Sequence, residues 1–184
     1  MKIIAVSGTP CTGKTTLAKK IAAKFNYKYL DVNKFIEQSG LPQEYDKKRK
    51  CKIIDIKKLN KALIKEIKAF EKLNDLFFIG DKKNFKKIKF LRYDGMVIDS
   101  HLSHYLPKKY VDLCVITKCN LKKLKKRLEK RSYSKSKVRE NLDAEIFDVC
   151  LNEAKENKHN VLIVDTSKKI DFSFQNFHFI NNSV

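Results

Sequence analysis

The chain has 184 residues, with 41 lysines and arginines against 21 aspartates and glutamates, which gives a formal net charge of +20. This length favours one domain that buries a core without disulfides or metals, and 5 glycines with 3 prolines exclude collagen-like and linker-type chains. Because no apolar run approaches the roughly 18 residues of a membrane span and no secretory signal is visible, we expect a cytoplasmic protein without a membrane partner.

The first element is a buried strand over residues 3–6, followed at once by the run Gly8-Thr9-Pro10-Cys11-Thr12-Gly13-Lys14-Thr15. This run matches the phosphate-binding loop pattern G-x-x-x-x-G-K-[ST] at every position. Residues 14–25 then carry Leu17, Ile21 and Phe25 at helical spacing, so the loop joins a strand to a helix as its mechanism requires.

The residue types of this loop suit a nucleoside triphosphate. Main-chain N–H groups ring the β-phosphate, Gly13 permits a close approach, and the start of the helix adds its positive dipole end. We expect Lys14 to reach the β- and γ-phosphates, the Thr15 hydroxyl to ligate Mg²⁺ and Thr16 to reach the α-phosphate. The expected ATP-binding residues are Cys11, Thr12, Gly13, Lys14, Thr15 and Thr16.

The next elements are a strand over 27–32 and a helix over 56–70, and two irregular segments flank that helix. Residues 33–56 predict a short helix followed by a charged stretch over 44–50. Residues 71–93 fit either a hairpin or a continuation of the preceding helix, and the pattern does not choose between them.

A third strand is predicted over 96–98 and ends in Asp99. In an open α/β sheet, ligands bind beyond the carboxyl ends of the strands, so we expect Asp99 to face the loop and hold Mg²⁺ through water. His101 lies two residues further on and points the same way in an extended chain, which suggests that it orients a water molecule or a phosphate. A capping role for Asp99 and a solvent-exposed, structural role for His101 are the alternatives.

A strand over 113–116 leads into a densely basic helix over 121–131. Most of its lysines are explained by a solvated outer face. Arg127 and Arg131 lie four residues apart, hence on one helical face, and Arg131 precedes a turn at Ser132-Tyr133-Ser134. An arginine on a mobile loop can close over phosphates and stabilise the charge in transfer, so both arginines are candidate ATP ligands.

A helix over 138–153 and a strand over 161–164 complete the regular pattern, and four phenylalanines in 172–180 suggest a last helix or a partner-binding patch. The alternation of strands and helices predicts a P-loop NTPase fold of the α/β class. We expect one domain over 1–184 with three α/β/α layers around a five-stranded parallel sheet.

The net charge bears on possible partners, and the cysteine count bears on disulfides and metal sites. The +20 charge fits an acidic partner, but only five of the 41 basic residues are arginine, so a general lysine bias is the preferred explanation and a surface for a polyanion is the alternative. Five cysteines are an odd number without a C-x-x-C pair, which predicts reduced thiols rather than a zinc site or a disulfide framework.

The chain resembles the adenylate kinase isoenzyme-six-type family of P-loop nucleoside monophosphate kinases over residues 2–169. The resemblance is carried by five blocks, of which D-S-H-L-S-H and E-N-x-x-A-E-I are the most specific. These blocks are residues 8–16, 45–55, 99–104, 127–133 and 140–146.

That resemblance implies the reaction ATP + AMP ⇌ 2 ADP with Mg²⁺ and some ATP hydrolysis. It implies an insert near 33–56 that binds the nucleoside monophosphate and a short lid near 130–140. It also implies a role in maturing small-subunit ribosomal RNA, with small-subunit ribosomal protein eleven and pre-ribosomal RNA as partners. The residues that it marks as catalytic are Lys14, Asp99, His101 and Arg131.

The chain departs from the family at two loop positions. Cys11 and Ser132 stand where relatives commonly have glycine, which affects backbone freedom in the loop and lid. Arg49 is the only arginine of the insert and is the candidate for the AMP phosphate. Two other functions remain open: a ribosome-assembly ATPase with little AMP kinase activity, and a non-enzymatic RNA-binding module.

Overall fold

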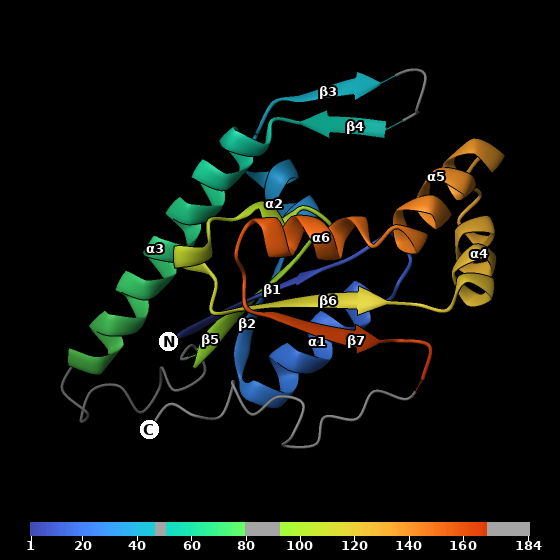
Figure 1. The fold of residues 1–184 in the computed structure, drawn as a ribbon. Coiled ribbons are helices and arrows are strands. Elements are labelled where there is room, and N and C mark those ends of the chain that lie inside the picture. Colours follow the sequence, from blue (N-terminus) through green and yellow to red (C-terminus); the bar gives the residue numbers. More distant parts are fainter. Residues whose placement is uncertain (47–50, 80–92, 169–184) are drawn as a thin grey trace.

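The computed structural model describes residues 1–46, 51–79 and 93–168 (Figure 1). Five parallel strands form the central sheet in the order β2-β5-β1-β6-β7, which confirms the predicted sheet and all five of its strands. Their bounds are β1 Lys2–Ser7, β2 Tyr27–Asp31, β5 Gly95–Asp99, β6 Leu113–Lys118 and β7 Val161–Asp165.

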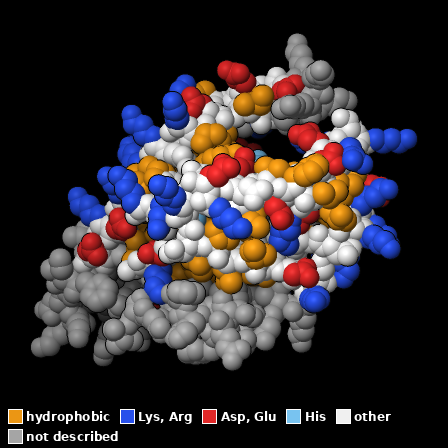
Figure 2. Space-filling model, in the orientation of Figure 1, with side chains coloured by type: hydrophobic (Ala, Val, Ile, Leu, Met, Phe, Trp, Pro, Cys, Tyr) orange, Lys and Arg blue, Asp and Glu red, His pale blue; other side chains and the backbone are white. Residues whose placement is uncertain are grey.

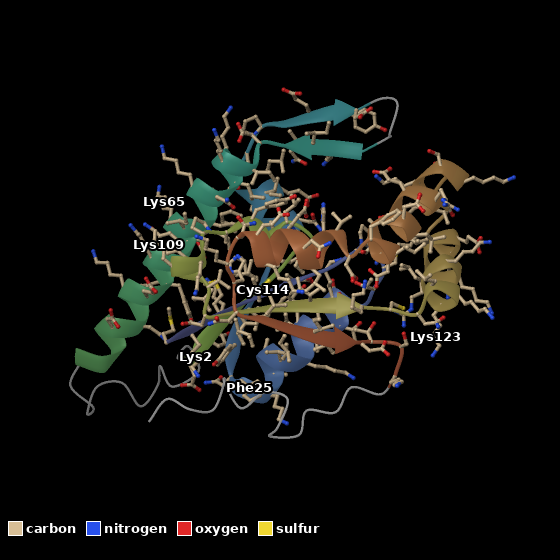
Figure 3. All side chains as sticks on the ribbon, in the orientation of Figure 1. Lys2, Phe25, Lys65, Lys109, Cys114 and Lys123 are labelled. Carbon is tan, nitrogen blue, oxygen red and sulfur yellow. The ribbon has the colours of Figure 1, made fainter. Side chains whose placement is uncertain are left out.

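The strands at the centre of the sheet are buried on both faces. Along β1, Ile3 and Ala5 pack into one core cluster, while Ile4 and Val6 pack into another on the opposite face. This two-residue alternation explains why the central strands appear in the sequence as unbroken apolar runs. Cys114 on β6 lies deep in the fold, as Figure 3 shows.

Helices cover both faces and make the three predicted layers (Figure 1). Helix α1, Lys14–Phe25, places Leu17 and Ile21 against one face. On the other face, α3, Ile56–Ile79, and α6, Val149–Glu156, share a cluster that contains Leu63 and Leu151.

Helix α3 extends the predicted helix 56–70 by nine residues, to Ile79. The first part of the 71–93 segment therefore continues the preceding helix and does not form a hairpin. Asn74 supports the added turns, because its buried amide donates to the Tyr93 carbonyl over 2.6 Å. The rest of this segment, residues 80–92, and the phenylalanine-rich residues 172–180 lie outside the described residues.

The segment 33–56 holds more structure than its sequence indicates. Helix α2, Val32–Gln38, is followed by an antiparallel hairpin of β3, Gln43–Asp46, and β4, Cys51–Ile54. The sequence predicted the helix but only a charged stretch after it. No apolar alternation marks the first strand, since three of its four residues are exposed.

The prediction of one helix over 138–153 is wrong. The chain forms α5, Lys135–Ile146, and α6, with a break at Phe147 and Asp148. Asp148 adopts a left-handed φ of 53°, and the Lys118 ammonium binds both its carboxylate and the Glu145 carbonyl. In the sequence, Ile146 and Val149 have the spacing of one apolar helical face, which predicted a single helix. In the structure, both side chains are exposed at the break between α5 and α6.

Helix α4, Leu121–Lys130, packs on α5 through a small cluster of Cys119, Leu124, Leu128 and Val138. Its lysines point outward, as Lys123 does in Figure 3. Across the described ranges, no helix is both long and apolar enough to cross a membrane.

Candidate active site

The phosphate-binding loop lies between the end of β1 at Ser7 and the start of α1 at Lys14. Gly8 has φ of 134°, and a Cβ there would lie 2.5 Å from Thr117 Oγ1 and 2.6 Å from the Thr117 carbonyl oxygen. Gly13 has φ of 100°. Both glycines are therefore required by backbone conformation, and Gly8 also by contact with β6.

Cys11 also has a left-handed backbone, with φ of 68°. A residue with a Cβ pays a steric penalty in this region. Ser132, in the turn between α4 and α5, has φ of 55°. The two positions at which the sequence departs from the expected glycine are thus positions where glycine would be the relaxed residue.

Lys14 lies over the loop, and its ammonium donates to the carbonyl oxygens of Gly8 at 2.8 Å and Thr9 at 2.9 Å. Burial lowers the pKa of Lys14 to about 8, and this effect exceeds the opposing influence of Asp99 and the nearby thiols. The ammonium is therefore weakly solvated and available to bind an anion inside the loop.

A cavity of about 950 Å³ opens at this loop and gathers residues from five parts of the chain. Nine of the ten predicted site residues line it: Cys11, Gly13, Lys14, Thr15, Thr16, Asp99, His101, Arg127 and Arg131. Figure 2 shows a hollow below the β3–β4 hairpin, with lysine and arginine side chains around the periphery of the molecule.

Thr12 is the exception among the ten. Its side chain is fully buried, donates to the Thr9 carbonyl over 2.7 Å and shares a hydrogen bond of 2.6 Å with Thr117. The Thr12 hydroxyl therefore faces the protein interior and holds the loop on β6. Only its main chain remains available to a ligand.

Asp99 ends β5 at the carboxyl edge of the sheet, as predicted, and is 5% exposed. Tyr29 on the neighbouring β2 donates its hydroxyl to Asp99 Oδ2 over 2.8 Å. Thr15 and Asp99 line the same cavity. An alcohol and a carboxylate beside a phosphate site are ligands that suit a hard divalent cation.

His101 lies in the loop after β5 and is exposed to the cavity. The surrounding protein and the Lys14 ammonium lower its pKa to about 4, so the ring is neutral near pH 7. The neutral His101 ring carries no charge, and it can donate one hydrogen bond and accept another.

His104 is buried behind the site and belongs to a network that the sequence did not reveal. Its Nδ1 shares a 2.7 Å hydrogen bond with the Ser7 hydroxyl, and its Nε2 lies 2.9 Å from Glu153 Oε2 on α6. Tyr105 donates to the other Glu153 oxygen over 2.7 Å. Within the described residues, His104, Cys150 and Glu153 form the one group of three potential metal ligands, although hydrogen bonds already satisfy His104 and Glu153.

The two predicted arginines have different surroundings. Arg127, half-buried on α4, donates to the Cys11 carbonyl at 3.3 Å and so contacts the loop itself. Arg131 forms the C-terminal cap of α4, is exposed and lines the cavity beside Tyr133. Arg131 is thus the arginine placed in the turn that joins α4 to α5.

Glu145 on α5 binds the phosphate-binding loop from the interior of the protein. This buried carboxylate accepts from the Thr9 hydroxyl at 2.6 Å and from the Cys119 main-chain N–H at 2.8 Å, and lies 3.4 Å from the Lys118 ammonium. The sequence placed Glu145 in a specific block but gave it no role. Its partners come from two distant segments, at Thr9 and at Lys118–Cys119, and spacing along the chain does not show this.

A second cavity, of about 430 Å³, lies between α2, the β3–β4 hairpin and the loop after β5. Its lining is mixed, with Ile36, Ile54 and Leu102 beside Asn33 and Glu37. Asn33 and His101 line both cavities, so the two adjoin. Arg49, which the sequence assigns to a monophosphate, lies outside the described residues.

Some lining residues escaped the sequence analysis. Thr166 follows the last strand, and its hydroxyl donates to the Thr12 carbonyl. The rule that ligands bind beyond strand ends could have marked Thr166, and also Asp31 at the end of β2. Tyr29 carried no comparable signal, because its side chain leaves the middle of a strand.

Comparisons with known proteins place this chain beside nucleotide kinases in sequence. Residues 4–148 match a family described as an AAA domain. The "Putative adenylate kinase" of Pyrococcus abyssi is 34% identical over 167 residues, covering 91% of this chain and 76% of the relative. The "Adenylate kinase isoenzyme 6 homolog" of Caenorhabditis elegans is 30% identical over 154 residues, covering 84% and 72%. Shikimate kinase from Acinetobacter baumannii, in complex with shikimate, aligns over 92% of this chain and 86% of its own, with 11% identity and a TM-score of 0.49.

Proposed function

This chain belongs to the adenylate kinase isoenzyme 6 family, and from that premise we propose that it transfers the γ-phosphoryl group of ATP directly to AMP, giving two ADP. The observation that carries the proposal is that two cavities, of about 950 and 430 Å³, adjoin at Asn33 and His101. Adjoining cavities suit two nucleotides whose phosphate tails meet end to end, whereas hydrolysis alone needs only one.

ATP takes the larger cavity. Main-chain N–H groups from Cys11 to Gly13 surround the β-phosphate, and the Lys14 ammonium leaves the Gly8 and Thr9 carbonyls to bind the β- and γ-phosphates. Thr16 reaches the α-phosphate. Because the ammonium is buried, its charge acts on the phosphates with little screening by water.

Mg²⁺ fits beside Thr15 and Asp99. Both side chains offer oxygen atoms and both line the cavity, and Asp99 accepts a hydrogen bond from Tyr29. When bound, the cation neutralises charge on the β- and γ-phosphates. The role of the chain is to hold Thr15 and Asp99 at the carboxyl edge of the sheet.

AMP takes the smaller cavity, with the segment 33–56 as the insert that receives it. The apolar side chains of Ile36, Ile54 and Leu102 offer a surface for a base, and Asn33 and Glu37 offer hydrogen bonds for its edge. His101 lies where the two tails meet and, being neutral, orients the acceptor phosphate or a water molecule without adding charge.

The turn from Lys130 to Ser134, within the segment 130–140, acts as the lid. Its closure brings the Arg131 guanidinium over the transferring phosphoryl group, where it stabilises the developing charge and excludes water. Arg127 supports the loop from its contact with the Cys11 carbonyl. Incomplete closure admits water to the γ-phosphate, which accounts for a side ATPase activity.

A role in maturing small-subunit ribosomal RNA, on a ribosomal protein and pre-ribosomal RNA, follows from the family resemblance. The net charge of +20 and the exposed lysines of α4 support contact with an anionic partner. If this second function is the main one, ATP hydrolysis drives a conformational change of the partner, and AMP phosphorylation is slow.

The decisive experiment measures ADP formation from ATP and Mg²⁺ with and without AMP. AMP should raise turnover by at least tenfold, and the product should be two ADP for each ATP consumed. Lys14→Met should abolish both rates, while Lys123→Met on the outer face of α4 serves as the matched control. If AMP leaves turnover unchanged and a ribosomal partner raises it, the switch ATPase replaces the kinase.

A further inference from the structure

We propose that Tyr29 is a positioning residue whose hydroxyl orients the Asp99 carboxylate to receive the nucleotide-bound cation. The inference rests on the proposed function, since it needs a cation site at Thr15 and Asp99. It assigns a role to a residue outside the loop, the D-x-H pair and the lid.

The geometry joins two neighbouring strands at one oxygen atom. Tyr29 lies on β2, and Asp99 ends the adjacent β5. The Tyr29 hydroxyl donates to Asp99 Oδ2 over 2.8 Å. The phenol therefore fixes the orientation of the carboxylate, while Thr15 lies in the first turn of α1 and lines the same cavity as Asp99.

Tyr29 does not line the cavity that Thr15 and Asp99 share. It therefore cannot act on the nucleotide by contact and must act through Asp99, to which its hydroxyl is bonded. The hydrogen bond occupies Asp99 Oδ2, which leaves Oδ1 as the oxygen free of this phenol. Such outer partners orient ligands and raise the affinity of a metal site.

The phenol is held firmly enough for this task. Its ring packs, half-buried, against the cluster that contains Leu17, Ile21 and Val97. The Lys19 ammonium lies 5.6 Å from the ring centroid. Burial and the Asp99 carboxylate raise the pKa of Tyr29, so the hydroxyl keeps its proton throughout the range in which the enzyme is handled.

The test is calorimetric titration of ADP into the full chain with and without Mg²⁺, so that the readout is binding and not turnover. In Tyr29→Phe, the gain in ADP affinity from Mg²⁺ should fall by about tenfold. The affinity without metal should stay within about twofold, because the phenol touches no part of the nucleotide. Tyr27→Phe, on the same strand but outside the site, should retain both affinities.

A double-variant cycle separates positioning from general support of the fold. Asp99→Asn should lose the Mg²⁺ effect by itself, and adding Tyr29→Phe should cost nothing further, since Tyr29 acts through Asp99. Additive losses would overturn the inference, and so would an equal loss of metal-free binding. A full Mg²⁺ effect in Tyr29→Phe would overturn it as well while leaving the kinase proposal intact.

A second variant serves if Tyr29→Phe does not fold. Tyr29→Leu keeps an apolar side chain against the cluster of Leu17, Ile21 and Val97 and removes the hydroxyl. The gain in ADP affinity from Mg²⁺ should fall by about tenfold in this variant too. A full Mg²⁺ effect contradicts the inference, and a natural chain that binds no ADP at all contradicts the proposed function instead.

Discussion

Thr9 and Glu145 meet across 136 residues of sequence, with the Thr9 hydroxyl donating to Glu145 Oε2 over 2.6 Å. Thr9 belongs to the phosphate-binding loop, and Glu145 lies in the last turn of α5, the helix that follows the proposed lid. The loop and the lid helices are therefore joined by one buried carboxylate. A displacement of α5 acts directly on the loop that holds the phosphates.

Removing this carboxylate should destabilise the fold. In Glu145→Ala, the Cys119 N–H and the Lys118 ammonium lose a buried acceptor, and the free energy of unfolding should fall by about 2–4 kcal/mol. Urea denaturation measures the change. Glu140→Ala, which removes only the exposed pair with Lys137, should cost under about 1 kcal/mol. Equal losses in the two variants would show that Glu145 does not anchor the loop.

Gly8→Ala should unfold or severely weaken the protein. The new Cβ would lie 2.5 Å from Thr117 Oγ1 and 2.6 Å from a main-chain oxygen, so the loop must leave β6. We expect a loss of about 3–5 kcal/mol in urea denaturation, with loss of nucleotide binding. Gly40→Ala is the matched control, because its φ is 63° but no atom lies within 4 Å of the added Cβ. Gly40→Ala should lower the free energy of unfolding by only about 1–2 kcal/mol.

Ser132→Gly should stabilise the chain. Ser132 is exposed and has φ of 55°, so glycine removes a steric penalty without removing a packed side chain. The gain should be about 0.5–1 kcal/mol, since greater freedom of the unfolded chain offsets part of the relief. Lys126→Gly, inside α4, should instead lose about 1 kcal/mol. Thermal denaturation of both variants and of the natural chain measures the change. A midpoint for Ser132→Gly below that of the natural chain would contradict the expected strain.

Nucleotide affinity should fall as the pH rises above 8. The pKa of Lys14 in the protein is lowered to about 8, so the ammonium is present below that pH and is lost above it. Phosphate binding favours the charged form, and ADP affinity without metal should be about tenfold weaker at pH 9 than at pH 7. Lys14→Met should show weak binding with no such slope between these two pH values.

His101 should contribute no transition near pH 6.5. Its pKa is lowered to about 4 by the surrounding protein and by Lys14, so it stays neutral as the pH falls from 8 to 5. A ¹H–¹⁵N spectrum that follows the His101 ring nitrogens over this range should show a neutral tautomer throughout. Protonation with a midpoint at 6 or above would contradict the environment described for this ring.

Much of the core was predictable because the signals are local. Five apolar runs and the 14–25 helix lie where the sequence placed them, and the loop pattern contains its own strand and helix context. The hairpin of β3 and β4 was missed since it packs little surface, so burial leaves no alternation in its residues. The break at Asp148 was missed because it depends on Lys118, which lies 30 residues away.

The buried strands, the glycines of the loop and the position of Lys14 at the start of α1 can be predicted from the amino-acid order alone, since each follows from period or backbone freedom within a few residues. The partners of the buried and half-buried hydroxyls could not be predicted and are known from the folded chain. Thr12 bonds with Thr117, Tyr29 donates to Asp99, and Thr9 donates to Glu145. These contacts form where parallel strands and the neighbouring helices end at one edge of the sheet. The residues that meet there are far apart in the sequence, so their spacing along the chain does not predict the contacts.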